Sequence, residues 1–351
     1  MTLSQPISLT SDALLPGLAF AAIRAVVLRD AQDNGRAVLE DVEGRITVQA
    51  RLGRMGFAKA EGGVAVTLAA ERADQLQTMR SMLIERLEKA APDAVAGLRW
   101  SDTEAAGAPP PNFRMVTVES VEPLGTDFLR VRIRASDFAL FDETSIHFRI
   151  LLPKPGADRI EWPTVAENGA TRWPSGEAAL HRPVYTAREI DPQAGTLTFD
   201  VFIHEGGRVT DWASAVAPGA QTGLMGPGGG GIPQTRRIAM FGDETAFPAI
   251  ARILDTLPGD ATGQVMLQSR RGAECRYPMP EHPGIAVTWL RRDGGPDLAE
   301  MALAERARWG ERFLWFAGEK SQCQRIRAAV KADGLATDQT YIAAYWTAPA
   351  A

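Results

Sequence analysis

The sequence predicts a multidomain chain: a small N-terminal α+β domain, an antiparallel β-barrel domain and a C-terminal α/β domain with a parallel sheet. The chain has 351 residues, more than a single hydrophobic core usually accommodates. Between residues 113 and 225, short strand-like runs recur between turn residues, which is typical of a small antiparallel barrel or sandwich. Beyond residue 235, strands alternate with helices, which indicates a parallel sheet. We place the domains at residues 1–105, 112–232 and 233–351.

The N-terminal domain is predicted from turn signals and periodicity. Asn34-Gly35 and Glu43-Gly44 flank strand-like runs, and residues 64–69 alternate as a further strand. Residues 74–90 place apolar side chains at helical spacing, as expected for an amphipathic helix. The domain contains no His or Cys, so its residues assign it no chemistry. Thr103 to Asn112 contains three consecutive prolines and is predicted to be a linker.

Composition and charge argue against several classes of protein function, among them nucleic-acid binding and metal binding by cysteines. The formal net charge is −5 and no Lys/Arg-rich run is present, which argues against nucleic acid as the main partner. The first residues form no signal-peptide pattern and no apolar run reaches membrane-spanning length, so we expect a cytoplasmic protein without a membrane span. Two cysteines, Cys275 and Cys323, cannot supply a four-thiolate iron–sulfur or zinc site. Redox chemistry would therefore need a bound organic cofactor.

In the barrel region, strands are expected at residues 115–119, 128–134, 145–152, 184–190 and 196–204. The third strand carries His147 and Arg149, and a hydrogen-bonded structural role is the first expectation for His147. Residues 153–180 form a long connection, and connections of this length are usually functional or disordered.

The stretch from His181 to Arg188 is the main candidate site. The guanidinium groups of Arg182 and Arg188 match phosphate oxygens, Tyr185 offers an aromatic face to a flat ring, and Thr186 offers a hydroxyl. A flavin makes this combination of demands. The alternative is a solvated edge strand with alternating charges. Strict alternation places Tyr185 on the opposite face from the other three, so a flavin would have to cross a strand end or a twist.

A second segment offers phosphate contacts. His204 precedes a Gly-rich turn, and a short helix that contains Trp212 is predicted to start near Thr210. Such a helix start exposes backbone N–H groups to a pyrophosphate. Thr210 would cap the helix or bind phosphate. The run Gly228–Gly231 is either an interdomain hinge or a ligand contact.

In the C-terminal domain, strands are expected at residues 238–242, 263–268, 285–290, 313–316 and 341–346, and helices at 297–309 and 321–331. Asp243, Glu244 and Thr245 follow the first of these strands, and Gly318 and Glu319 follow the fourth. Parallel sheets bind ligands at the carboxyl ends of their strands. No Gly-x-Gly-x-x-Gly motif is present, so the pattern alone favours an α/β nucleotide-binding domain without further detail.

These motifs resemble a known family. The strand Arg-Pro-Val-Tyr-Thr-Ala-Arg at residues 182–188 resembles the flavin site of the ferredoxin-reductase-like flavoenzymes. Gly-Asp-Glu-Thr-Ala-Phe-Pro-Ala-Ile from residue 242 and Ala-Gly-Glu from residue 317 are similar to the siderophore-interacting proteins, which are NAD(P)H-dependent ferric-siderophore reductases. The resemblance runs from about residue 112 to about residue 347. The first hundred residues resemble a domain of unknown function that is sometimes fused ahead of this family and ends in a strand like Leu98-Arg99-Trp100.

The chain departs from the family pattern at three positions. Arg149 stands where many members have Lys, and Glu205 stands where a glycine of the turn motif is common. Thr347 replaces the Arg that commonly follows Tyr-Trp, which removes a cation from the region expected to meet an anionic ferric chelate.

The resemblance implies that the barrel binds FAD, that the α/β domain binds NAD(P)H, and that electrons pass through the flavin to a ferric siderophore or other iron chelate, releasing Fe(II). It implies no catalytic acid or base and no metal ligand. The implied cofactor contacts are Arg182, Tyr185, Thr186, Arg188, His204, Thr210, Trp212, Asp243, Glu244, Thr245, Gly318 and Glu319. The implied substrate contacts are Arg149, Tyr345 and Trp346.

Two alternatives remain open from the sequence. One is a flavin reductase or diaphorase-type enzyme that passes electrons to free flavin, a quinone or a carrier protein. The other is a non-catalytic siderophore-binding protein. The sequence decides neither NADH against NADPH nor which siderophore is used.

Overall fold

The computed structural model describes residues 9–33, 36–102, 106–136, 138, 140–142 and 145–349. The chain divides into two compact units, one formed by residues 1–113 with 153–181 and the other by residues 114–152 with 182–351. The long connection 153–181 therefore packs with the N-terminal unit, although it lies between two barrel strands in the sequence. The predicted Asn34-Gly35 turn and residues 103–105 of the predicted linker lie outside the described residues.

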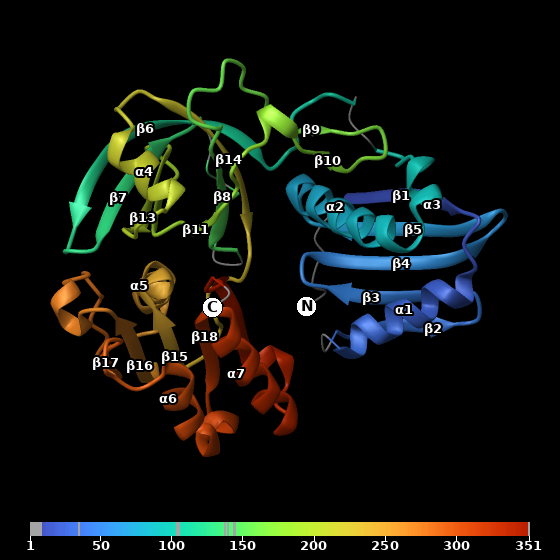
Figure 1. Cartoon of the computed structure of the whole chain (residues 1–351). Helices are drawn as coiled ribbons and strands as arrows, with labels where there is room; N and C mark the ends of the chain where they lie inside the picture. Colours follow the sequence, from blue (N-terminus) through green and yellow to red (C-terminus); the bar gives the residue numbers. More distant parts are fainter. Residues whose placement is uncertain are drawn as a thin grey trace. The chain divides into compact units, whose positions relative to one another are not determined.

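The N-terminal unit contains a five-stranded antiparallel sheet in the order β1-β5-β4-β3-β2 (Figure 1). Its strands are β1 (Leu9–Pro16), β2 (Val38–Val42), β3 (Arg45–Ala50), β4 (Gly53–Ala60) and β5 (Gly63–Ala70). Helices α1 (Phe20–Asp33), α2 (Ala73–Ala90) and α3 (Pro92–Ala96) complete the unit. Leu76, Met79 and Leu83 of α2 are buried in the core, as their helical spacing predicts.

Three parts of this unit differ from the sequence prediction. Strands β1 and β4 and helix α1 were not predicted, because their apolar residues follow neither the alternation of a strand nor the spacing of a helix clearly. The expected strand at residues 98–100 is wrong, since Trp100 forms only a single bridge to Ala13. The connection 153–181 also carries a short hairpin, β9 (Thr164–Val165) and β10 (Thr171–Arg172), and one turn of 3-10 helix.

The barrel is a seven-stranded antiparallel sheet in the order β11-β8-β14-β6-β7-β13-β12. Its strands are β6 (Phe113–Leu124), β7 (Phe128–Arg134), β8 (His147–Leu151), β11 (Val184–Thr186), β12 (Glu189–Asp191), β13 (Thr196–Phe202) and β14 (Gln221–Gly228). The edge strands β11 and β12 follow one another in the chain. The N–H of Ala187 donates to Ile146 O (2.9 Å) and that of Arg188 to Thr198 O (2.8 Å), so the chain steps from one edge to the other. The prediction of one continuous strand at 184–190 is therefore wrong.

The α/β domain has a five-stranded parallel sheet in the order β17-β16-β15-β18-β19 (Figure 1). Its strands are β15 (Arg237–Asp243), β16 (Thr262–Ser269), β17 (Ile285–Arg291), β18 (Phe313–Glu319) and β19 (Thr340–Trp346). Its helices are α5 (Phe247–Thr256), α6 (Leu298–Ala304) and α7 (Lys320–Ala332). Strand β15 is buried from Ile238 to Asp243, as expected for a central strand of a parallel sheet.

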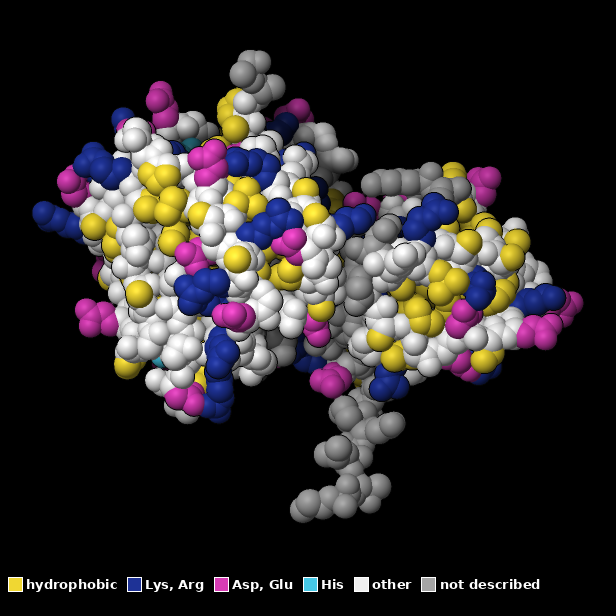
Figure 2. Space-filling view, turned by 90° about the horizontal axis from the view of Figure 1, so that it is seen from below, with side chains coloured by type: hydrophobic (Ala, Val, Ile, Leu, Met, Phe, Trp, Pro, Cys, Tyr) yellow, Lys and Arg dark blue, Asp and Glu magenta, His cyan; other side chains and the backbone are white. Residues whose placement is uncertain are grey.

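Charged side chains of both signs share the surface. On the face drawn in Figure 2, Lys and Arg side chains lie among Asp and Glu side chains, so this face presents no extended field of a single sign. Within the ranges that the structure describes, no helix combines the length and the apolar character needed to cross a membrane.

Candidate functional site

Two arginines meet at the edge of the barrel. Strand β11 pairs with β8 so that Val184 lies opposite Arg149, Tyr185 opposite Phe148 and Thr186 opposite His147. The guanidinium of Arg149 donates to the backbone carbonyl of Arg182 over 2.8 Å, and both residues are exposed. Arg149 was predicted as a substrate contact and Arg182 as a cofactor contact, and the structure places the two residues side by side. Two neighbouring arginines could bind a phosphate or another anion.

Tyr185 packs against the barrel interior. Its ring centroid lies 5.3 Å from that of Phe199, and burial raises the pKa of its hydroxyl. The residue as a whole is half-buried. Tyr185 is therefore an aromatic residue of the edge strand β11 whose ring is held by packing against the barrel interior.

Thr186 has a partner that the sequence did not indicate. Its hydroxyl oxygen lies 3.2 Å from Nδ1 of His147, and both side chains are buried. Nε2 of His147 lies 3.2 Å from the hydroxyl of Tyr345 in β19. His147 thus occupies the structural role expected first, and Tyr345 packs inside the unit instead of facing solvent. The predicted contacts of Thr186 with a flavin and of Tyr345 with a substrate stay predictions.

Arg188 is also committed to a protein partner. It is buried and forms an ion pair of 2.7 Å with Asp255 in α5. Its Nε is buried without a hydrogen-bond partner among the residues that the structure describes. Arg188 lies two residues after the end of β11, and its guanidinium connects this part of the barrel to α5. Its expected contact with a cofactor stays a prediction.

The Gly-rich turn at residues 204–207 leads into helix α4 (Arg208–Ala215), which begins two residues before the position predicted from the sequence. Gly207 is the N-cap and no side chain caps the helix, so Thr210 is not the cap. Thr210 instead lies inside the first turn and donates to the carbonyl of Phe202 (3.4 Å). A Cβ on Gly207 would lie 2.7 Å from the ring of His204 and 2.8 Å from Oγ1 of Thr210. Trp212 packs against the barrel core.

The carboxyl end of β15 is a buried acidic site. Oδ1 of Asp243 accepts from the N–H (3.0 Å) and the hydroxyl (2.5 Å) of Thr245, and Oδ2 accepts from the indole N–H of Trp346 (2.6 Å). Burial raises the pKa of Asp243, and these hydrogen bonds oppose the shift. A Cβ on Gly318 would lie 2.9 Å from Oδ2 of Asp243, which explains the glycine there.

Glu244 is held by two arginines. Its carboxylate accepts from the backbone N–H of Arg270 (2.8 Å) and from the guanidinium of Arg292. Burial raises the pKa of Glu244, while Arg292 acts in the opposite direction. The same guanidinium lies 5.9 Å from the ring centroid of Trp346. Five of the predicted nucleotide and substrate residues therefore belong to one network: Asp243, Glu244, Thr245, Gly318 and Trp346.

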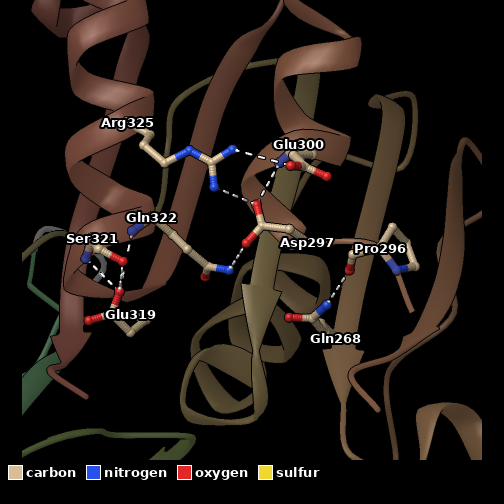
Figure 3. Close-up of polar contacts among 8 residues, drawn as sticks. All are labelled: Gln268, Pro296, Asp297, Glu300, Glu319, Ser321, Gln322 and Arg325. Carbon is tan, nitrogen blue, oxygen red and sulfur yellow. Dashed lines mark hydrogen bonds and ion pairs between the residues drawn. The ribbon is translucent and has the colours of Figure 1, made fainter. Parts of the chain in front are cut away.

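Helix starts at the same edge of the sheet are capped by acidic side chains (Figure 3). Glu319 accepts from the N–H groups of Ser321 (2.5 Å) and Gln322 (3.3 Å), and the hydrogen bonds from Ser321 hold its pKa below the usual range. The first turn of α7 is thus occupied by its own side chain. A nucleotide phosphate would have to share or displace that contact.

Four polar residues at this edge were not predicted as site residues: Gln268, Asp297, Gln322 and Arg325. Asp297 caps α6 through the N–H of Glu300 (2.9 Å), and it accepts from Gln322 Nε2 (2.8 Å) and Arg325 (2.9 Å) (Figure 3). Gln268 Nε2, at the end of β16, donates to Pro296 O (2.7 Å). The sequence signal for Asp297 was present, because an Asp directly before a helical run is a typical N-cap.

Two family models match the chain in succession. Residues 117–231 match the siderophore-interacting FAD-binding domain, and residues 235–349 match the siderophore-interacting protein model. The matched ranges contain the barrel apart from the first residues of β6, the connection 153–181 and the α/β domain, and residues 1–116 lie outside both.

Known proteins match the same part of the chain. The NADPH-dependent ferric-chelate reductase of Escherichia coli is 28% identical over 245 residues, which are 67% of this chain and 93% of that protein. The mycobactin import ATP-binding/permease protein IrtA of Mycolicibacterium thermoresistibile is 28% identical over 244 residues, 66% of this chain and 24% of that protein. This chain thus spans about a quarter of the length of that relative.

A solved structure also aligns with this chain. It is a siderophore utilization protein from T. fusca, with 26% identity, a TM-score of 0.58, and coverage of 70% of this chain and 97% of that one. Over residues 117–349, this chain belongs to the siderophore-interacting protein family.

Proposed function

We propose that this protein is an FAD-dependent oxidoreductase that passes electrons from NAD(P)H to a ferric siderophore or a similar iron chelate and releases Fe(II). The observation that carries the proposal is the paired edge of β8 and β11. There the guanidinium of the exposed Arg149 contacts the backbone carbonyl of the exposed Arg182, and Tyr185 follows with its ring packed toward the barrel interior, within the range that matches an FAD-binding domain. We also propose a cytoplasmic location, where NAD(P)H is available.

The residues present fit a flavin dinucleotide. At the start of α4, the backbone N–H groups of the first turn have no side-chain cap, and such groups can donate hydrogen bonds to phosphate oxygens. The absence of a Cβ at Gly207 allows the His204 ring and the Thr210 hydroxyl to pack closely against this turn. Arg182 would bind phosphate, and the ring of Tyr185 would lie against the flavin ring.

When bound, FAD would supply the change from two-electron donation by NAD(P)H to one-electron reduction of iron. The chain's own residues would orient and enclose the reactants. Thr245 and the edge formed by Gly318 would face the nicotinamide nucleotide, while the buried Asp243 and Glu244 shape this edge through Trp346 and Arg292. Arg149 is exposed and cationic, and it would attract an anionic chelate.

Anaerobic reduction tests the proposal. The purified protein should carry or bind FAD, its flavin absorbance should bleach on addition of NADPH or NADH, and a ferric chelate should restore it with formation of Fe(II). Reoxidation by free flavin or a quinone but not by any ferric chelate would contradict the substrate and favour a flavin reductase. A protein that gains no flavin spectrum with added FAD would contradict the whole proposal and favour a non-catalytic binding protein.

A further inference from the structure

The β9–β10 hairpin of the connection 153–181 is hydrogen-bonded to helix α2 of the N-terminal unit. Gln77 Nε2 donates to the carbonyl of Gly169 (3.0 Å), and Gln77 is buried. The N–H of Thr171 donates to the hydroxyl of Ser81 (3.2 Å), and the two hydroxyls lie 3.1 Å apart. These contacts join residues about ninety positions apart in the sequence.

A second set of contacts continues the attachment. The indole N–H of Trp100 donates to Asn168 O (3.0 Å), and Arg99 pairs with Glu167 (2.9 Å). Val165 exchanges backbone hydrogen bonds with the segment predicted as a linker: its N–H donates to Ala108 O (2.8 Å) and its carbonyl accepts from Gly107 N–H (3.0 Å). The predicted linker is therefore partly ordered by the hairpin.

The hairpin turn is shaped to fit the unit that holds it. Gly169 has φ +79°, and a Cβ there would lie 2.5 Å from Cδ of Arg80 and 2.6 Å from Cδ1 of Trp100. The Arg80 guanidinium lies 5.2 Å from the ring centroid of Trp100, and Arg80 is itself buried with hydrogen bonds to Ser11 and Asp102 (both 2.8 Å). A glycine is required at this position because the hairpin backbone touches both side chains.

We propose that the N-terminal α+β unit acts as an intramolecular dock for the connection 153–181, and that this docking is required for tight FAD binding. The connection lies inside the range that matches the FAD-binding domain, whereas residues 1–116 lie outside both family models. The unit thereby acquires a role that its residues alone did not suggest. The part of the inference that concerns FAD rests on the proposed function.

The chain itself links the dock to the flavin strand. The docked connection ends at His181, and Arg182 follows directly. Strand β11 has only three residues and pairs with β8 over three positions. The position of such a short strand depends on how the preceding connection 153–181 is held. A free connection would have to be ordered when FAD binds, and that ordering would weaken the affinity.

Two glycine substitutions test the dock. Gly169→Ala introduces the clash with Arg80 and Trp100, whereas Gly156→Ala, at φ +71° in the same connection, meets no atom within 4 Å. Both variants carry the same kind of backbone strain, so only contact with the dock differs. In full-length protein, amide hydrogen exchange of residues 164–172 should be at least about tenfold faster in Gly169→Ala than in the parent and in Gly156→Ala.

FAD titration provides the functional measurement. The dissociation constant of FAD should rise about three- to tenfold in Gly169→Ala and remain near the parental value in Gly156→Ala. Unchanged exchange in Gly169→Ala would overturn the dock, and faster exchange with unchanged FAD affinity would overturn its role in binding. If the parent bound no FAD, both the proposed function and the predicted effect on FAD affinity would be wrong. Hydrogen exchange would still test whether the connection is docked on the N-terminal unit.

A gentler variant covers the case in which Gly169→Ala does not fold. Ser81→Ala removes the acceptor of the Thr171 N–H without adding atoms to the hairpin. Faster exchange at Thr171 together with weaker FAD binding would support the dock. Parental exchange at Thr171 would overturn it.

Discussion

The hydroxyl of Tyr345 in β19 lies 3.2 Å from Nε2 of His147 in β8, which joins the last strand of the parallel sheet to the barrel. The glycine run at residues 228–231 makes this approach possible. A Cβ on Gly229 would lie 2.5 Å from the imidazole of His147, and one on Gly230 would overlap the ring of Tyr341. Close packing of these rings thus accounts for two glycines that the sequence assigned to a hinge or a ligand contact.

Removing the Tyr345 hydroxyl should destabilise the fold. Tyr345→Phe leaves the ring in place but deletes the contact with His147, and we expect a loss of about 0.5–1.5 kcal/mol in the free energy of unfolding, measured by urea denaturation. Tyr185→Phe is the matched control, because its hydroxyl has no hydrogen-bond partner in the described part of the chain. Equal losses in both variants would show that the His147 contact contributes nothing specific.

Arg182 should contribute directly to cofactor affinity. Arg182→Ala would remove the proposed charge-assisted phosphate contact, so FAD binding should weaken by about 1.5–3 kcal/mol in a fluorescence titration. Arg237→Ala serves as the control, because Arg237 is exposed at the amino end of β15, away from the carboxyl edge where ligands bind. If the two variants bound FAD equally tightly, Arg182 would not be the phosphate ligand.

The buried Asp243 should make stability depend on pH. Its folded-state pKa is raised above the ordinary value of 3.8, chiefly by burial. The folded state therefore binds the proton more tightly than the unfolded chain, and stability falls as pH rises from that ordinary value through the raised folded pKa. Asp243→Asn lacks this titration. The stability advantage of the parent over Asp243→Asn should accordingly shrink as the pH rises from about 4.

Urea denaturation of both proteins across that pH range measures the difference directly. Constant costs of the substitution, such as an altered contact with Trp346, cancel because only the change with pH is compared. An advantage that stays constant or grows with pH would mean that burial does not raise the pKa of Asp243.

The cap of α6 should be measurable as well. Burial opposes ionisation of Asp297, but hydrogen bonds from Gln322, Glu300 and Arg325 lower its pKa overall (Figure 3). Asp297→Ala should reduce the free energy of unfolding by about 1–2 kcal/mol. Asp297→Asn keeps an acceptor for the Glu300 N–H and should lose clearly less. Equal losses for Ala and Asn would place the effect in the ion pair with Arg325 rather than in the cap.

The sequence predicted local elements well where periodicity is strong. Strand β7 was predicted with its observed bounds, and helix α2 and the parallel strands were predicted to within a few residues. Alternation and helical spacing report which side chains are buried, and burial decides these elements. The sequence also placed Arg182, Tyr185 and Thr186 together, because they lie within five residues of the chain, in and directly before strand β11.

Partners across long sequence separations were decided by the tertiary structure alone. The ion pair of Arg188 with Asp255, the pairing of Glu244 with Arg292, and the attachment of residues 164–171 to α2 all join segments that no local pattern connects. The break of the strand after Thr186 belongs to the same class, since it arises where the sheet closes on itself.

By itself, then, the amino-acid sequence determined the three kinds of domain and the residue types offered to a flavin and a nicotinamide nucleotide, because local spacing and side-chain chemistry carry that information. Only the tertiary structure decided which of those side chains already hold protein partners and which N-terminal surface holds the connection before Arg182. The physical reason is that a side chain can hydrogen-bond or pair with many others, and the packed fold selects one.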